Sequence, residues 1–211
     1  MDAPLDCLHE DEWLLVIVKP SGLLAVPGRG ADKADCLSAR AQVRWPDALV
    51  VHRLDEATSG LMLLARSPAV QRALGRAFER REIDKRYVAV VGGQLAATDD
   101  WQTIDAPLAA DWPNRPRQQV DAALGKPAQT RWRVLGVENG NTRVELQPLT
   151  GRTHQLRVHL ASIGHPILGD RLYAPASLQA AAPRLLLHAS ELRLSHPGSG
   201  VALHLRSAAP F

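Results

Sequence analysis

The chain has 211 residues, 45% of them apolar and 22% charged, with a formal net charge of +3. This composition is typical of a folded globular protein and excludes a disordered chain. No apolar run approaches the ~20 residues that a membrane-spanning helix needs, which argues against an integral membrane protein.

Several missing sequence motifs exclude further classes of protein. The N-terminal residues lack the apolar core of a signal peptide, so a cytoplasmic location is expected. Cys7 and Cys36 have neither CxxC nor histidine-finger spacing, so neither a zinc site nor a disulfide framework is expected. A phosphate-binding GxxxxGK[ST] loop and a GxSxG hydrolase elbow are also missing. No metal and no other cofactor is predicted.

The first half of the chain predicts short strands and two helices. The apolar run at residues 13–18 predicts a buried strand, which ends in the Lys-Pro-Ser-Gly turn of residues 19–22. Residues 36–43 favour a short helix, and residues 48–51 and 61–65 favour strands. Ser67 before Pro68 predicts a helix start. The apolar stripe of that helix holds Val70, Leu74 and Phe78.

The second half predicts mainly strands. Residues 88–91 form one, residues 94–127 look irregular, and residues 128–137 and 142–147 predict a hairpin around Asn139-Gly140. Thr153 is expected to cap a helix that buries Leu156, Leu160 and Ile163 and stops at Gly164. Residues 185–187 and 201–205 complete the sheet. The predicted fold class is α+β, a single catalytic domain with a mixed, largely antiparallel β-sheet flanked by helices and loops.

One loop combines features that suggest chemistry. Asp55 stands between the basic pair His52-Arg53 and a Thr58-Ser59 turn that leads into an apolar strand. Enzymes often place reactive groups on loops that rigid strands hold in position. The alternative is that Asp55 only caps the following turn through backbone amides.

Basic residues gather in two stretches, residues 66–86 and 115–133. Such clusters attract a phosphate backbone by Coulomb forces and counterion release. A solvated helix face with its own ion pairs is the alternative.

Four stretches together resemble one family. Residues 52–61, HRLDEATSGL, resemble the active-site motif of the large-subunit-type pseudouridine synthases. Residues 19–28 resemble the N-terminal motif of this family, and residues 85–87 its tyrosine motif. Residues 151–159 together with 164–170 resemble its C-terminal motif. The matches keep the order of the family over residues 8–206, and the S4-like RNA-binding domain that several members carry is not expected here.

The resemblance implies the pseudouridine synthase fold and an isomerase that acts on RNA without a cofactor. The enzyme would break the N1–C1′ bond of a uridine, turn the base and rejoin it through C5. Residues 111–116 and 125–130 resemble the members that modify both a large-subunit ribosomal RNA hairpin and the anticodon stem-loop of some transfer RNAs. A monomer in rRNA and tRNA processing is expected. An RNA-binding or chaperone protein on the same fold is the alternative.

The resemblance also implies roles for single residues. Asp55 would attack the ribose C1′ or take a proton from C2′, and the sequence does not choose between these. Arg157 would hold the carboxylate, with Arg152 as the fallback. Tyr87 would stack on the uracil and act at C5, unless it is only a half-buried strand residue.

Base flipping adds a second set of residues. Arg53 would enter the space that the flipped base leaves. His52 either contacts RNA or supports the loop. Arg152, Arg115 and Arg117 are expected among the contacts to RNA phosphates.

Overall fold

The computed structural model describes residues 5–30, 33–96 and 100–211. They form two compact units, the first made of Met1–Lys85 and Ala189–Pro210 and the second of Arg86–His188 and Phe211. The boundaries fall inside strands β5 (Asp84–Val91) and β11 (Leu187–Ser195). The expectation of a single domain stays a prediction. None of the helices in the described ranges is long and apolar enough to cross a membrane.

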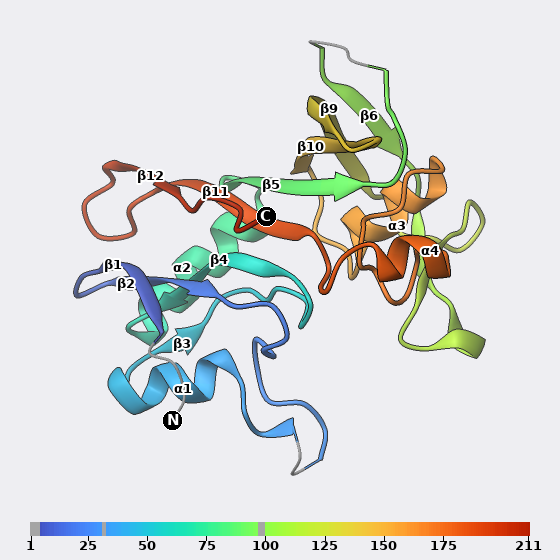
Figure 1. Cartoon of the computed structure of the whole chain (residues 1–211). Helices are drawn as coiled ribbons and strands as arrows, with labels where there is room; N and C mark the ends of the chain where they lie inside the picture. The colour runs from blue at the N-terminus through green and yellow to red at the C-terminus, as the bar shows by residue number, and fades with distance from the viewer. Residues whose placement is uncertain (1–4, 31–32, 97–99) are drawn as a thin grey trace. The chain divides into compact units, whose positions relative to one another are not determined.

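The first unit is a sheet with the strand order β1-β2-β4-β11, in which β3 also pairs with β4 and β12 with β11 (Figure 1). The pairs β1-β2, β2-β4, β3-β4 and β11-β12 run antiparallel. Besides β11 its elements are β1 (Asp6–Glu10), β2 (Leu14–Lys19), α1 (Leu37–Arg44), β3 (Leu49–Val50), β4 (Ser59–Ala65), α2 (Pro68–Glu79) and β12 (Ala202–Arg206).

Strands β2 and β4 are apolar on both faces because each face is covered. On one face, the α2 residues Val70 and Leu74 pack against alternate residues of the two strands. On the other face, Leu37 and Ala41 of α1 pack against the remaining ones. Burial on both sides explains why these strands read as continuous apolar runs rather than as an alternating pattern. The pairing also places Lys19, at the end of β2, opposite Gly60, at the start of β4.

The second unit is built on the strand order β5-β10-β9-β6, with a separate pair β7-β8. Helix α3 packs against β9 and β10. Along β10 buried residues alternate with half-exposed ones, so one face of this sheet is covered and the other is open to solvent. Besides β5 the elements are β6 (Gln102–Asp105), β7 (Leu108–Ala110), a 3-10 turn (Trp112–Asn114), β8 (Gln118–Val120), β9 (Gln129–Glu138), β10 (Asn141–Pro148), α3 (Gln155–Ser162) and α4 (Ala176–Ala180).

Two of the local predictions are confirmed in detail. Ser67 caps α2 by accepting a hydrogen bond from the Val70 amide (3.3 Å), and Pro68 opens the helix. Asn139 (φ 51°) and Gly140 (φ 76°) form the tight turn between β9 and β10. Both turn residues take a positive φ, as the hairpin turn that Asn-Gly signals requires.

The expectation for residues 94–127 is wrong, because this segment contains β6, β7 and β8. These strands are three or four residues long, too short for an apolar period to register. Strand β7 pairs with β8 across a turn at residues 111–117. The strand expected at 185–187 meets β11 only at Leu187, where β11 begins; the strand extends to Ser195 with polar residues along its second half.

Candidate active site

Asp55 lies in a loop that a backbone hydrogen bond closes into a turn. The amide of Thr58 donates to the carbonyl of Asp55 (3.1 Å). Asp55 is half-buried, while Leu54 before it and Thr58 after it are buried. The loop therefore has anchors on both sides of the carboxylate.

The buried ammonium group of Lys19 stabilises this loop through hydrogen bonds to backbone carbonyls. The Nζ of Lys19, which is 0% exposed, donates to the carbonyls of Pro20 (2.9 Å), Leu23 (2.7 Å) and Glu56 (2.9 Å). The Gly22 amide also donates to the Glu56 carbonyl (2.9 Å). These bonds join the turn after β2 to the residue that follows Asp55. Charged donors form the stronger kind of hydrogen bond, so this link is stiff.

A second bond repeats the same connection. The hydroxyl of Ser21 donates to the carbonyl of Ala57 (2.7 Å). The motif at residues 19–28 therefore has a physical function that sequence reasoning missed: its Lys19 and Ser21 hold the Asp55 loop. The Lys-Pro-Ser-Gly pattern of residues 19–22 predicts a turn but not its contact with the Asp55 loop.

Glycine is required where the loop enters β4. Gly60 has φ +117°, and a Cβ placed on it would lie 2.3 Å from the carbonyl oxygen of Ala189. This close approach lets β11 pair with β4 at its first residues. Any side chain at this position would push the end of the Asp55 loop away from β11.

His52 is engaged within the first unit. Its Nε2 accepts a hydrogen bond from the backbone amide of Leu63 (2.9 Å), and its ring packs on Phe78, with centroids 4.6 Å apart. Burial, with a smaller effect of the Lys85 ammonium, lowers the pKa of His52 to about 3. The ring is therefore neutral at pH 7 and supports the loop. The predicted contact of His52 with RNA stays a prediction.

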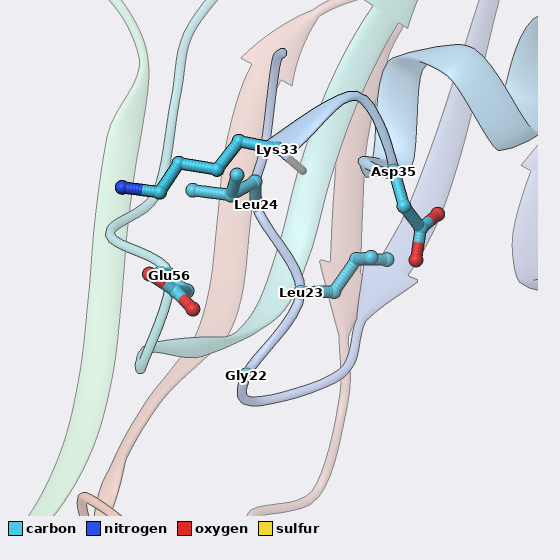
Figure 2. Close-up of a pocket in the computed structure, with 6 residues that line it drawn as sticks. All are labelled: Gly22, Leu23, Leu24, Lys33, Asp35 and Glu56. Carbon is cyan, nitrogen blue, oxygen red and sulfur yellow. The ribbon is translucent and has the colours of Figure 1, made fainter. Parts of the chain in front are cut away.

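A pocket of about 320 Å³ lies beside the same loop (Figure 2). Glu56 stands on one wall, and the side chains of Lys33 and Asp35 stand on the others. Arg40 neutralises Asp35 through two hydrogen bonds of 2.6 Å. Because the walls carry both signs of charge, the pocket does not by itself indicate a site for phosphate.

Tyr87 lies on β5 in the second unit, opposite Leu146 of β10. It therefore shares the covered face of the sheet with Leu146, the face that carries α3. Tyr87 is half-buried. Its neighbour Arg86 points to the opposite face because successive strand residues alternate.

Arg157 is buried in α3 and makes a bidentate ion pair. Its Nε and Nη2 lie 2.8 and 2.7 Å from the two carboxylate oxygens of Asp170. The exposed fractions are 5% for Arg157 and 1% for Asp170. Asp170 also accepts from the amides of Leu172 (2.9 Å) and Tyr173 (3.3 Å). A fork with two parallel bonds fixes the plane of the guanidinium. Asp170 is the last residue of the motif at 151–159 and 164–170, and the sequence alone predicted no role for it.

The start of α3 differs from the expectation. Thr153 does not cap the helix; the N-cap residue is His154, in a left-handed conformation (φ 54°) and without a side-chain cap. Gln155 holds this turn instead, accepting from the Arg152 amide (3.0 Å) and the Thr150 hydroxyl (2.7 Å). These bonds fix the loop before α3, although they do not cap the amides of its first turn. Gly164 ends the helix as predicted (φ 84°), whereas Ile163 is 36% exposed rather than buried.

The three other arginines expected to bind RNA are exposed. Arg115 stacks on Trp112, its Cζ 3.4 Å from the ring centroid. Arg117 donates to the carbonyl of Leu172 through both Nε and Nη2, which ties the β7–β8 hairpin to residues 170–173. The Nε of Arg152 donates to the carbonyl of Pro127 (3.1 Å). Arg53, the residue expected to replace the flipped base, is exposed as well.

Within the described residues, three side chains of types that bind metal ions lie close together. The ligand atoms of His9, Asp11 and His196 lie within 4.8 Å of one another. However, Nδ1 of His196 accepts from the amides of Gly198 (3.2 Å) and Ser199 (3.0 Å). The neutral ring then carries its proton on Nε2, the atom that faces Asp11 and that a metal would need. The geometry fits a hydrogen-bonded clamp around Asp11 better than a metal site.

The second unit thus places Tyr87 and the helix of Arg157 on one face of its sheet, and the first unit presents Asp55 on a braced loop. Asp55 belongs to a different unit from the other two, so their convergence stays a prediction.

The chain is similar to known proteins in both sequence and structure. Residues 13–162 match the sequence model of the RNA pseudouridylate synthases. A protein of Yersinia pestis named dual-specificity RNA pseudouridine synthase RluA is 48% identical over 205 residues, covering 97% of this chain and 98% of that protein. Its namesake from Haemophilus influenzae is 43% identical, covering 98% and 94%. The solved structure of human RNA pseudouridylate synthase domain containing 1 superposes with a TM-score of 0.80 at 29% identity, covering 98% of this chain and 84% of that one.

Proposed function

This chain belongs to the RNA pseudouridylate synthase family, and on that premise we propose that Asp55 is its catalytic carboxylate. The chain is an isomerase that converts uridine in RNA to pseudouridine. The N1–C1′ bond breaks, the base turns and a C5–C1′ bond forms; the C5 proton leaves and N1 takes up a proton, so the atoms balance. One observation carries the assignment of Asp55: Lys19 and Ser21 hold the loop on both of the residues that follow it.

A fixed carboxylate suits either mechanism that the chemistry allows. Direct attack of Asp55 on C1′ needs an oxygen aimed at that carbon, and removal of the C2′ proton needs one aimed at the neighbouring hydrogen. Both demand a side chain whose backbone does not drift. The hydrogen bonds to the Glu56 and Ala57 carbonyls supply this rigidity.

Arg157 is proposed as the cation that faces the Asp55 carboxylate and keeps it ionised. The Asp170 pair supports this role, because two parallel hydrogen bonds fix the Arg157 guanidinium in one plane. Arg152 is the less suited candidate, since it is exposed.

Tyr87 is proposed to stack on the uracil and to act at C5. Its place on the face that carries α3, half-buried at the start of β5, supports the assignment. Phenolic hydroxyls transfer protons when they are held close to the reacting carbon.

Arg53 is proposed to occupy the gap that the flipped nucleotide leaves. It is exposed between the supported His52 and the buried Leu54, so its neighbours are anchored while its own side chain faces solvent. A planar guanidinium replaces part of the stacking energy of a base, which lowers the few kcal/mol that flipping takes.

The substrate is proposed to be a hairpin of large-subunit ribosomal RNA and the anticodon arm of some transfer RNAs. The dual specificity named for the relatives supports two RNA classes. Arg115, Arg117 and Arg152 are proposed to contact RNA phosphates. His52 is proposed to contact the RNA as a neutral ring that contributes no charge. We further propose a monomer that works in the cytoplasm.

The test is tritium release from [5-³H]uridine-labelled RNA, with wild type, Asp55→Asn and the exposed neighbour Glu56→Gln as a matched control. Release is expected from an anticodon stem-loop and from a ribosomal hairpin. Asp55→Asn should lower it by at least about 10³-fold, and Glu56→Gln by less than about threefold. Unchanged turnover by Asp55→Asn would refute its catalytic role. If the wild type binds both RNAs and releases tritium from neither, an RNA-binding protein without catalysis would be favoured instead.

A further inference from the structure

Three arginines converge on one tryptophan on the open face of the second unit. The Cζ atoms of Arg86, Arg131 and Arg133 lie 4.7, 5.2 and 4.9 Å from the centroid of the Trp101 ring. The side chains come from β5, from the residue before β6 and from β9. Trp101 and the three arginines are half-exposed. We call these four residues the Trp101 cluster.

Among the described residues, the charge of one arginine of the cluster is not balanced by a carboxylate. Arg133 pairs with Glu145 (2.6 Å). Arg131 donates to the neutral amide of Gln147 at 3.5 Å, and within the described part of the chain no carboxylate pairs with it. Like charges gathered around one ring repel each other unless an anion lies between them. The cluster is therefore arranged for an anionic ligand.

The chemistry of the cluster matches nucleic acid. Guanidiniums stacked on an indole are held flat. Arg131, which among the described residues donates only to the neutral Gln147 amide, keeps N–H groups able to contact phosphate oxygens. Unpaired bases stack on both guanidinium planes and aromatic rings. An acidic peptide would use the charge but not the flat surfaces.

The cluster lies on the opposite face of the sheet from Tyr87. Arg86 and Tyr87 are consecutive on β5 and so point to opposite faces. Arg131 and Arg133 lie across from Gln147 and Glu145, on the half-exposed side of β10, whereas Tyr87 lies across from the buried Leu146. A nucleotide at the Trp101 cluster is therefore not the nucleotide at Tyr87.

We propose that the Trp101 cluster binds a single-stranded segment of the RNA substrate that flanks the modified stem-loop. This inference rests on the proposed function, which supplies RNA as the substrate. It predicts that the protein gains affinity from RNA outside the stem-loop, and that this gain depends on Arg131 and Trp101.

The test compares a fluorescein-labelled anticodon stem-loop with the same stem-loop carrying single-stranded adenosine tails of about ten nucleotides, a length within the site sizes of such surfaces. Fluorescence anisotropy over a salt series gives the Kd and the salt slope for the full chain and for Arg131→Gln and Trp101→Leu. Arg143→Gln is the matched control, since Arg143 lies on the same side of β10 but pairs with Glu138 (2.8 Å).

The tailed RNA is expected to bind the wild type about five- to tenfold more tightly than the bare stem-loop. Arg131→Gln and Trp101→Leu should remove most of this gain, and Arg131→Gln should lower the salt slope by about one. The control should keep the gain. Equal weakening of both RNAs, or no gain from the tails in the wild type, would overturn the proposal.

Tritium release from the bare stem-loop separates this proposal from the proposed function. Arg131→Gln should release tritium from it at the wild-type rate, within about twofold. If the wild type releases none but the tail-dependent binding persists, the catalytic assignment fails and the binding surface stands.

Discussion

The ammonium of Lys19 donates a hydrogen bond of 2.9 Å to the backbone carbonyl of Glu56, the residue that follows Asp55. The two groups are 37 positions apart in the chain. Lys19 is fully buried, so the bond forms away from water, where a charged donor interacts strongly with a carbonyl dipole. The loop with the candidate carboxylate is therefore coupled to the first buried strand of the protein.

Replacing Lys19 with Met should loosen this loop. The change removes the donor of three hydrogen bonds, to the carbonyls of Pro20, Leu23 and Glu56, of which the Leu23 bond is buried. We expect the free energy of unfolding to fall by about 2–4 kcal/mol. Turnover should fall more than RNA affinity. Urea denaturation and tritium release measure the two effects. Ser21→Ala, which removes one bond to Ala57, should lower stability by only about 1 kcal/mol. Equal stability losses in the two variants would contradict the bracing role of Lys19.

Asp170→Asn should disturb Arg157 without touching the helix that carries it. The amide would leave the buried guanidinium with part of its charge uncompensated, which typically lowers stability by about 3–5 kcal/mol. Glu138→Gln breaks the exposed pair with Arg143 and should change stability by less than about 1 kcal/mol. Thermal or urea unfolding decides the comparison. A similar small loss in both variants would show that the Asp170 pair is not structural.

Local patterns predicted much of this molecule, and particular residues show why. The Ser67-Pro68 start of α2 and the Asn139-Gly140 turn depend on neighbouring residues, so the sequence displays them. Strands β7 and β8 depend on each other across a turn, and neither is long enough to show a period.

In the candidate site, too, residues within sequence motifs could be predicted, whereas their contacts with distant residues could not. Asp55, Tyr87 and Arg157 stand in motifs and were predicted as site residues, and their roles stay predictions. The partners Lys19 with Glu56 and Arg157 with Asp170 are separated by 37 and 13 positions. Which carbonyl or carboxylate such a side chain meets is set by the packing of distant segments, and one sequence carries no signal for that choice.

Tyr87→Phe should reduce turnover by about 10²-fold or more while leaving RNA affinity within about threefold. The ring that stacks on uracil remains, and only the hydroxyl that acts at C5 is lost. Tyr173→Phe is the matched control. Its hydroxyl lies 2.7 Å from His154 and accepts from the Gln118 amide (2.8 Å), so its loss should appear mainly as lower stability. A turnover loss in Tyr87→Phe that a weaker Kd explains fully would count against a role at the base.

His52 should make folding stability depend on pH in the acid range. Its pKa is lowered to about 3 in the folded protein, mainly by burial, against about 6.5 in an unfolded chain. Between these values the unfolded state binds more protons, so stability is full above about pH 6.5 and falls as the pH drops toward 3. One group contributes at most about 1.4 kcal/mol per pH unit.

The matched variant is His52→Gln, because its side-chain oxygen can still accept from the Leu63 amide but does not titrate in this range. Urea unfolding at several pH values should show a flatter stability curve between pH ~6.5 and ~4 than in the wild type. Asp11 provides a separate acid window. Burial raises the pKa of Asp11, but hydrogen bonds from Leu14, Trp13, His9 and His196 outweigh this and hold it well below its usual range. Asp11→Asn should therefore flatten the curve only below about pH 4. An identical slope above that pH in His52→Gln and the wild type would mean that His52 is not kept neutral by the fold.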